Sequence, residues 1–108
     1  MTTIHDENWD LASRVQLTPA AVELGPGELG VVIARTHPTG WFVSARYRPG
    51  LAVGDLEDFA EFVRVRVYLL LENGPTGSVW EPTGDQEAWR AVCTPSRLEM
   101  PEEVEAFR

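Results

Sequence analysis

The stretch Phe62–Asn73, FVRVRVYLLLEN, is the segment that most restricts what this chain can fold into. Its odd positions from 63 to 71 are Val or Leu, and its even positions carry Arg64, Arg66 and Glu72 among aromatic and aliphatic side chains. Because successive side chains of a β-strand point to opposite faces, this alternation predicts a strand with one buried and one mixed face. Asn73–Gly74 predicts a turn at its end.

Residues 29–48 predict a β-hairpin. Leu29–Thr36 and Trp41–Arg48 are rich in Val, Ile and aromatic residues, and HPTG between them has turn chemistry. One face of the second strand would carry Trp41, Val43, Ala45 and Tyr47, and the other Phe42, Ser44, Arg46 and Arg48. If this strand lies beside Phe62–Asn73, four arginines share one sheet face: Arg46, Arg48, Arg64 and Arg66.

Short helices are predicted around these strands. One covers Asn8–Val15, with Asn8 as N-cap and with Trp9 and Leu11 facing inward. A second covers GDLEDFAEF, capped by Asp55. The segment LTPAAVELGPG is ambiguous between a helix that starts at Thr18–Pro19 and a strand through Val22–Leu24.

The C-terminal third leaves one further alternative open. After a short strand in GSVWEP, the spacing of Thr83 and Gln86 fits a capping box, which predicts a helix over TGDQEAWRAVC. A strand over EAWRAV that pairs back on SVWE is the alternative. A last helical turn is predicted to begin at Pro101.

These elements predict one α+β domain over residues 1–108, with residues 1–7 frayed. An antiparallel sheet of four to five strands would dominate it, accompanied by two to three short helices. Closure of the sheet into a small barrel, or a β-sandwich, are the alternative architectures.

Composition restricts location and chemistry. The 108 residues carry a net charge of −8, one cysteine and no lysine. The polar, acidic N-terminus lacks the features of a signal peptide, no apolar run approaches a membrane span, and a lone cysteine excludes an internal disulfide. We therefore expect a cytoplasmic protein. The exclusive use of arginine, with much Ala, Val, Gly and Pro, indicates a GC-rich bacterial or phage origin.

No motif fixes a reaction. GPGELG matches G-x-G-x-x-G, but a predicted strand follows it, so we interpret it as a turn and not as a phosphate loop. The absence of lysine excludes P-loop and Schiff-base chemistry, and the acidic total disfavours nucleic-acid binding. His5 and His37 have no metal-ligand neighbours at useful spacing, so we expect no metal and no cofactor. Cys93 fits a core position better than a nucleophile paired with His37.

The first functional hypothesis is a non-enzymatic accessory domain that binds a protein partner, or itself, through an arginine and aromatic sheet face. The residues expected to bind the partner are Trp41, Arg46, Arg48, Arg64, Arg66, Tyr68 and Trp80. A homodimer would use an apolar patch at Tyr68 and Leu70. A structural alternative is that acids of DLEDFAE or of the C-terminal segment cover the arginines internally.

Two other hypotheses remain. An acidic inhibitor of the immunity or anti-defence type would mimic nucleic acid, or cap a basic enzyme surface, through Asp55, Glu57, Asp58 and Glu61, aided by Glu99–Glu105. A small-ligand binder or enzyme would need a pocket lined by Trp41, Trp80, His37 and Arg46.

Overall fold

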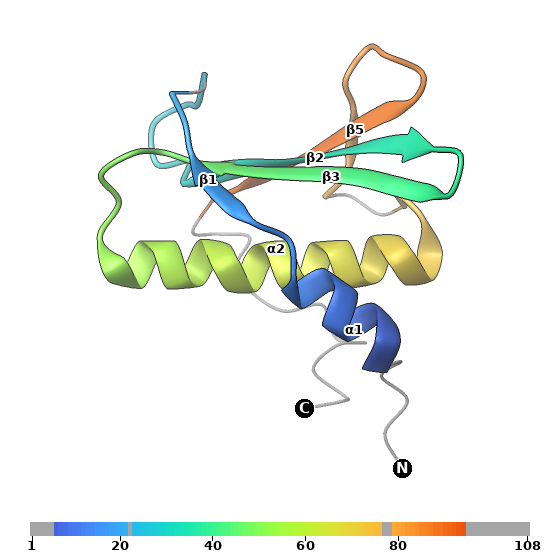
Figure 1. The fold of residues 1–108 in the computed structure, drawn as a ribbon. Helices are drawn as coiled ribbons and strands as arrows, with labels where there is room; N and C mark the ends of the chain where they lie inside the picture. The colour runs from blue at the N-terminus through green and yellow to red at the C-terminus, as the bar shows by residue number, and fades with distance from the viewer. Residues whose placement is uncertain (1–5, 22, 77–78, 95–108) are drawn as a thin grey trace.

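The computed structural model describes residues 6–21, 23–76 and 79–94, in which two helices lie on the same face of one sheet (Figure 1). In chain order the elements are α1 (Asp6–Ser13), β1 (Leu17–Pro19), β2 (Gly30–His37), β3 (Gly40–Tyr47), α2 (Val53–Asn73), β4 (Glu81–Pro82) and β5 (Ala88–Cys93). The α+β class predicted from the sequence is confirmed.

The sheet has five strands in the order β1-β3-β2-β5-β4. β1 runs parallel to β3, and the other neighbours are antiparallel. The predicted strand number is therefore right, but the sheet is mixed rather than wholly antiparallel. Over the described residues it is one open sheet with helices on one of its two faces, so the barrel and sandwich alternatives are wrong.

The predicted hairpin is confirmed. β2 and β3 pair from Gly30↔Tyr47 to His37↔Gly40. Pro38 and Thr39 form the connecting turn, in which the His37 Nδ1 lies 2.9 Å from the Thr39 hydroxyl and accepts its backbone N–H at 3.2 Å. At Thr18–Pro19 the predicted helix start is wrong, because these residues belong to β1.

The strand predicted for Phe62–Asn73 is wrong, because this stretch is the C-terminal part of α2, a helix of 21 residues. Two stripes of the helix are covered. Phe59, Val63, Val67 and Leu70 pack into the core with the sheet residues Val32 and Ala34. Arg64, Tyr68 and Glu72, spaced four residues apart, lie against α1.

Contacts between α1 and α2 are specific. The Trp9 and Tyr68 rings meet edge to face with centroids 5.4 Å apart, and the Arg64 guanidinium lies 5.8 Å from the Trp9 ring centroid. The Asn8 side-chain amide donates to the Glu72 carboxylate. A helix buried on two sides needs apolar residues almost all round, and this requirement produced the run that resembles an alternating strand.

The helix ends differ in detail from the predictions. α2 begins after Ala52, which makes no side-chain cap hydrogen bond, and Asp55 lies within the first turn. At the other end Gly74, with φ 78°, donates its N–H to the Leu70 carbonyl at 2.8 Å. α1 begins before Asn8, and Leu11 is 46% exposed, so its predicted inward orientation is wrong.

For residues 88–93 the strand alternative is confirmed and the helix is wrong. β5 pairs with β2 along its length and with β4 at Glu81↔Arg90 and Pro82↔Trp89. The Thr83 hydroxyl does not cap a helix; it donates to the Ala88 carbonyl at 3.2 Å and accepts the Asp85 N–H at 3.3 Å. The predicted helical turn at Pro101 and the residue Val22 lie outside the described residues. Glu23 and Leu24 belong to no strand, so the strand predicted through Val22–Leu24 is wrong at these two positions.

The closest approach of helix and sheet occurs at Gly30. A Cβ atom built there would lie 2.6 Å from the Cε1 atom of Phe59 and 2.7 Å from the Arg46 carbonyl oxygen. Phe59 is fully buried, and its ring also contacts Tyr47 and Phe62. The absence of a side chain at Gly30 therefore sets how deeply α2 can sit on the sheet.

We predict that Gly30→Ala lowers the free energy of unfolding by about 1–3 kcal/mol, since overpacking of this order is the usual cost of an unaccommodated methyl group. Chemical denaturation would measure it. Gly54→Ala is the matched control, because a Cβ at this helical position meets nothing within 4 Å. Equal stability of the two variants would contradict the packing role of Gly30.

Candidate interaction surface

The arginine and aromatic face predicted from the sequence is divided between two layers of the structure. Arg46 belongs to β3 of the hairpin, as expected, and Arg48 follows directly after it, whereas Arg64, Arg66 and Tyr68 belong to α2. The helix packs on one face of the sheet, and the Arg46 side chain points to the other. The structure therefore does not bring these residues together.

The α2 residues of that hypothesis are buried. Arg66 is 5% exposed, and its guanidinium lies 4.9 Å from the centroid of the Phe62 ring. Tyr68 and Leu70 are 3% and 1% exposed. The apolar patch predicted for a homodimer is thus part of the core, and the prediction of a dimer through it is wrong.

Other predicted site residues have structural roles. The Arg48 Nε donates to the Glu28 carbonyl at 3.2 Å, and its Nη2 donates to the Gly25 carbonyl at 2.9 Å, so this side chain holds the loop that precedes β2. Trp80 is buried in the core. Trp41, half-buried on the helix side of the sheet, packs edge to face on Trp89 with centroids 5.7 Å apart.

Arg46 remains exposed, on the sheet face opposite α2. Strand alternation and the pairing register assign the residues of this face, which we call the open face. They are Thr18 of β1, Val31, Ile33 and Arg35 of β2, Phe42, Ser44 and Arg46 of β3, Glu81 of β4, and Ala88, Arg90 and Val92 of β5. Neither helix covers it (Figure 1).

Phe42 is the most prominent apolar side chain of the open face, with 64% of its surface exposed. Arg35 lies directly opposite it on β2. The alternation of the hairpin already places Phe42 on the face of Arg46, and this signal identifies it without the structure. Arg90 and its neighbour Ile33 were missed because their pairing depends on the strand β5, for which the sequence favoured a helix.

The charges of the open face are unevenly neutralised. Arg35 pairs with Asp85, and the Arg90 Nε lies 4.0 Å from a Glu81 carboxylate oxygen. Arg46 forms no ion pair with any residue in the described part of the chain. Among the described residues, the open face therefore presents one guanidinium without an ion pair, that of Arg46, four residues along β3 from the exposed Phe42.

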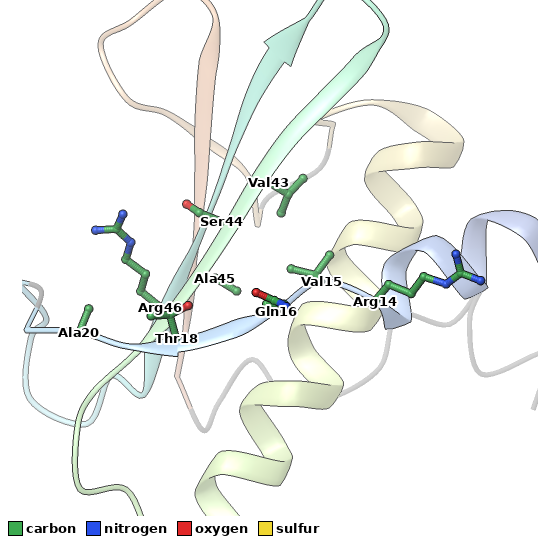
Figure 2. A pocket seen from close by; sticks show the side chains of 9 residues that line it. All are labelled: Arg14, Val15, Gln16, Thr18, Ala20, Val43, Ser44, Ala45 and Arg46. Carbon is green, nitrogen blue, oxygen red and sulfur yellow. The ribbon is translucent and has the colours of Figure 1, made fainter.

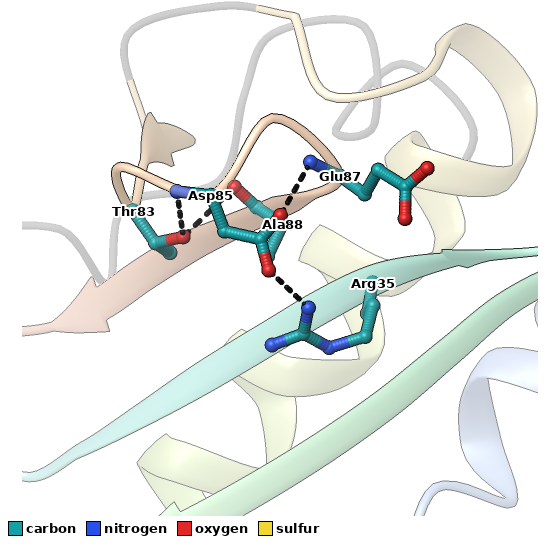
Figure 3. Close-up of polar contacts among 5 residues, drawn as sticks. All are labelled: Arg35, Thr83, Asp85, Glu87 and Ala88. Atoms are coloured by element: carbon teal, nitrogen blue, oxygen red, sulfur yellow. Dashed lines mark hydrogen bonds and ion pairs between the residues drawn. The ribbon is translucent and has the colours of Figure 1, made fainter.

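A network around Asp85 fixes the β4–β5 loop beside the open face (Figure 3). Its carboxylate accepts the Glu87 N–H at 2.9 Å and a hydrogen bond from the Arg35 guanidinium. Both contacts hold the pKa of Asp85 below its ordinary value, the Glu87 hydrogen bond most strongly. Arg35 is thus engaged by Asp85, whereas Arg46 forms no ion pair within the part of the chain that the structure describes.

A hollow of about 610 Å³ lies at the edge of β3, between this strand and the chain that leaves α1 (Figure 2). Its lining comprises Arg14, Val15, Gln16, Thr18, Ala20, Val43, Ser44, Ala45 and Arg46. The pocket predicted from the sequence is not this one, because Trp41, Trp80 and His37 do not line it. Those three residues and Arg46 do not converge.

The acidic residues proposed as an alternative surface lie on α2. Asp55, Glu57 and Asp58 are exposed. A carboxylate oxygen of Glu61 lies 4.0 Å from a guanidinium nitrogen of Arg64. α2 occupies the opposite side of the sheet from Arg46. These acids therefore do not cover the arginines of the open face; the C-terminal acids lie outside the described residues.

Cys93 and His37 are separated by the length of β2. Cys93 pairs with Gly30 at one end of that strand, and His37 forms its other end. Seven residues of extended chain span about 23 Å. Burial raises the pKa of the Cys93 thiol from 9.0 to about 12, so a Cys93–His37 nucleophile pair is wrong.

Among residues 6–21, 23–76 and 79–94, no three His, Cys, Asp or Glu side chains gather where they could hold a metal ion. No helix within these ranges is long and apolar enough to cross a membrane. Comparison of the chain with protein-family models, curated proteins and solved structures finds no match.

We predict that Cys93 resists thiol reagents in the folded protein. A rise of the pKa from 9.0 to about 12 lowers the thiolate fraction near pH 8 by about a thousandfold, and burial also blocks access. Labelling with a chromogenic disulfide at pH 8 would measure the rate, with the denatured chain as control. Similar rates in both states would contradict the buried position.

We predict a pH-dependent contribution from Asp85. Since its folded-state pKa lies below 3.8, its contacts stabilise the fold above the unfolded pKa, and this contribution is lost as the pH falls through the folded value. Wild type should therefore be more stable than Asp85→Asn near pH 7, and the difference should vanish in acid. Denaturation at several pH values, with an NMR titration of the carboxyl, would measure both effects.

Proposed function

We propose that the protein is a non-enzymatic interaction module that binds an acidic surface of a protein partner through its open face. The observation that carries the proposal is the presence, on one strand of that face, of the 64% exposed Phe42 and of Arg46, which forms no ion pair with any described residue. An exposed large aromatic residue near arginine is the composition typical of binding hot spots.

Geometry supports a flat protein ligand. Phe42 and Arg46 lie four residues apart, which in an extended strand places their Cα atoms about 13 Å apart on the same side. Between them Ser44 is half-buried, and across the strand pair lie Ile33 and Val31. A partner could therefore pack apolar side chains against Phe42 and Ile33 while a carboxylate reaches Arg46.

The chemistry of Arg46 favours a carboxylate. A guanidinium forms two parallel hydrogen bonds to a carboxylate, and such charge-assisted bonds are stronger than neutral ones. In the free protein this group has no described acid to pair with, so binding would not require an internal ion pair to break. Arg35, by contrast, would have to leave Asp85.

We predict that Phe42→Ala and Arg46→Glu each abolish retention of a partner in affinity capture from cells, compared by quantitative mass spectrometry. Each change removes an exposed group, so folding should be preserved and can be checked by thermal unfolding. The control carries Asp55→Asn, Glu57→Gln and Asp58→Asn on α2 and should retain the same partner. Retention by both open-face variants would overturn the proposal.

A second candidate function, the acidic inhibitor, is favoured by one observation. Asp55, Glu57 and Asp58 are exposed near the start of α2, and none forms an ion pair with a described residue. Such a cluster would meet a basic surface of an enzyme. If the control variant loses a partner that both open-face variants retain, this function replaces the first.

A further inference from the structure

The outer edge of β3 is only partly covered. β3 extends from Gly40 to Tyr47, but β1 pairs with it at Ala45, Arg46 and Tyr47 alone. The chain between α1 and β1 diverges from β3, and the hollow of about 610 Å³ lies where it does so (Figure 2). Residues 40–44 of β3 are thus an exposed edge among the described strands.

The hydrogen-bonding pattern between β2 and β3 shows which backbone N–H and C=O groups of β3 point outward at this edge. Arg48 donates its N–H to the Leu29 carbonyl at 2.9 Å, so these two form a hydrogen-bonded pair, and such pairs alternate along antiparallel strands. Phe42, Ser44 and Arg46 therefore bond to β2, while Trp41, Val43, Ala45 and Tyr47 direct their N–H and C=O outward. Ala20 satisfies Tyr47 by donating to its carbonyl at 3.1 Å.

Trp41 and Val43 remain with outward backbone groups. The described part of the chain supplies no hydrogen-bond partner for these groups, because β1 does not reach them. An exposed row of N–H and C=O groups is a template for one more strand. Aromatic and β-branched residues at positions 41–43 are also those that pair best in strands.

Proline marks the two short strands that end the sheet, and none occurs at the exposed edge of β3. β1 contains Pro19 and β4 contains Pro82, and neither can donate a backbone hydrogen bond to an added strand. Prolines in short edge strands are a common protection against unwanted pairing. The unprotected edge at Trp41–Ser44 contrasts with them.

We propose that the partner contributes an extended acidic segment, which pairs as an added strand with β3 at Trp41–Ser44. This inference rests on the proposed function and deepens it, because Phe42 and Ser44 of the same edge belong to the open face. Side chains of the added strand would alternate, some lying beside Phe42 and Ser44 and the others on the side of Trp41 and Val43.

Charge complementarity selects an acidic segment. None of the described residues that line the hollow is acidic, whereas Arg14 and Arg46 lie at its opposite ends (Figure 2). Arg14 pairs at 2.6 Å with Asp10, an exposed i,i+4 contact that contributes little, and Arg46 has no described acid. Carboxylates near the two ends of the added strand would reach these guanidinium groups.

A second copy of the chain fits less well. Antiparallel pairing of two β3 edges centred on Phe42 would bring Pro38–Thr39 of one copy to the place where Leu17–Thr18 of the other lie beside Ala45 and Arg46. Two copies would also each carry a net charge of −8, which disfavours association. We therefore assign the edge to a partner segment.

The test begins with a probe of defined composition. A phage-displayed library of random 12-residue peptides is selected on the full chain, and an enriched peptide is synthesised. The expected peptides contain Asp or Glu among alternating apolar residues. In the added strand, alternate peptide amides would face β3, and N-methylation of these amides should weaken binding at least about tenfold. This is the expected effect of losing one to two backbone hydrogen bonds. N-methylation of the amides that face away from β3 should leave binding unchanged.

Protein variants give the reciprocal test. Val43→Pro removes an N–H that points away from β2, so every hydrogen bond to β2 is kept, and the affinity for the peptide should fall at least about tenfold. The control variant Val43→Ala keeps this N–H and should bind the peptide as tightly as wild type. Thermal unfolding checks that both variants fold. If Val43→Pro does not fold, the N-methylated peptides decide alone.

The outcomes separate this inference from the proposed function. Loss of binding with Phe42→Ala and Arg46→Glu, but not with Val43→Pro or N-methylation, overturns edge pairing and leaves the open face as the site. If binding is lost only with Val43→Pro and with N-methylation, pairing at the β3 edge is supported and the open face is overturned as the binding site. If the selection enriches no acidic peptide, the acidic segment is overturned as the occupant of the edge. The same conclusion follows if sedimentation shows a dimer of the wild type that Val43→Pro dissociates.

Discussion

The burial of α2 on two sides is the constraint on which the rest of the structure depends. The helix sits on the sheet at Gly30, where the Phe59 ring takes the space that any side chain would need. Its other side receives α1 through Trp9 and Tyr68. Because the two helices of the described residues occupy the same side of the sheet, neither lies over the opposite face, and Phe42 and Arg46 are exposed there. The candidate surface is thus a consequence of where the chain places its helices.

Local patterns predicted the hairpin well and the longest helix badly, for one physical reason. In β2 and β3 the period of two coincides with turn residues at Pro38–Thr39, and an antiparallel pair with one covered face satisfies both signals. In Phe62–Asn73 the same period arises from a helix whose two covered stripes together make nearly every position apolar. Length was the better criterion, since no proline interrupts the 21 residues of Val53–Asn73 and Gly74–Pro75 follows them.

Because the C-terminal part of α2 was predicted as a strand, Arg64 and Arg66 were assigned to the wrong part of the molecule. On a strand beside β3, Arg64 and Arg66 would have joined Arg46 on a common surface; on α2, one stacks on Trp9 and the other lies buried over Phe62. The spacing of Thr83 and Gln86 likewise predicted a helix where β5 lies. A threonine hydroxyl at this position can cap a helix or bond within a tight loop, and the sequence pattern is the same for both. Only the pairing of β5 with β2, a contact between distant segments, brings Arg90 beside Ile33.

The net charge of −8 and the basic open face are compatible because charges act over short distances in salt. The Debye length at physiological ionic strength is about 8 Å, and α2 lies on the opposite side of the sheet from the Arg46 side chain. The acids Asp55, Glu57 and Asp58 on α2 are therefore largely screened from Arg46. A partner that approaches the open face meets the local field of the guanidinium group, while the acidic side disfavours the reverse orientation. The uneven distribution of charge, rather than its sum, would then determine how a partner docks.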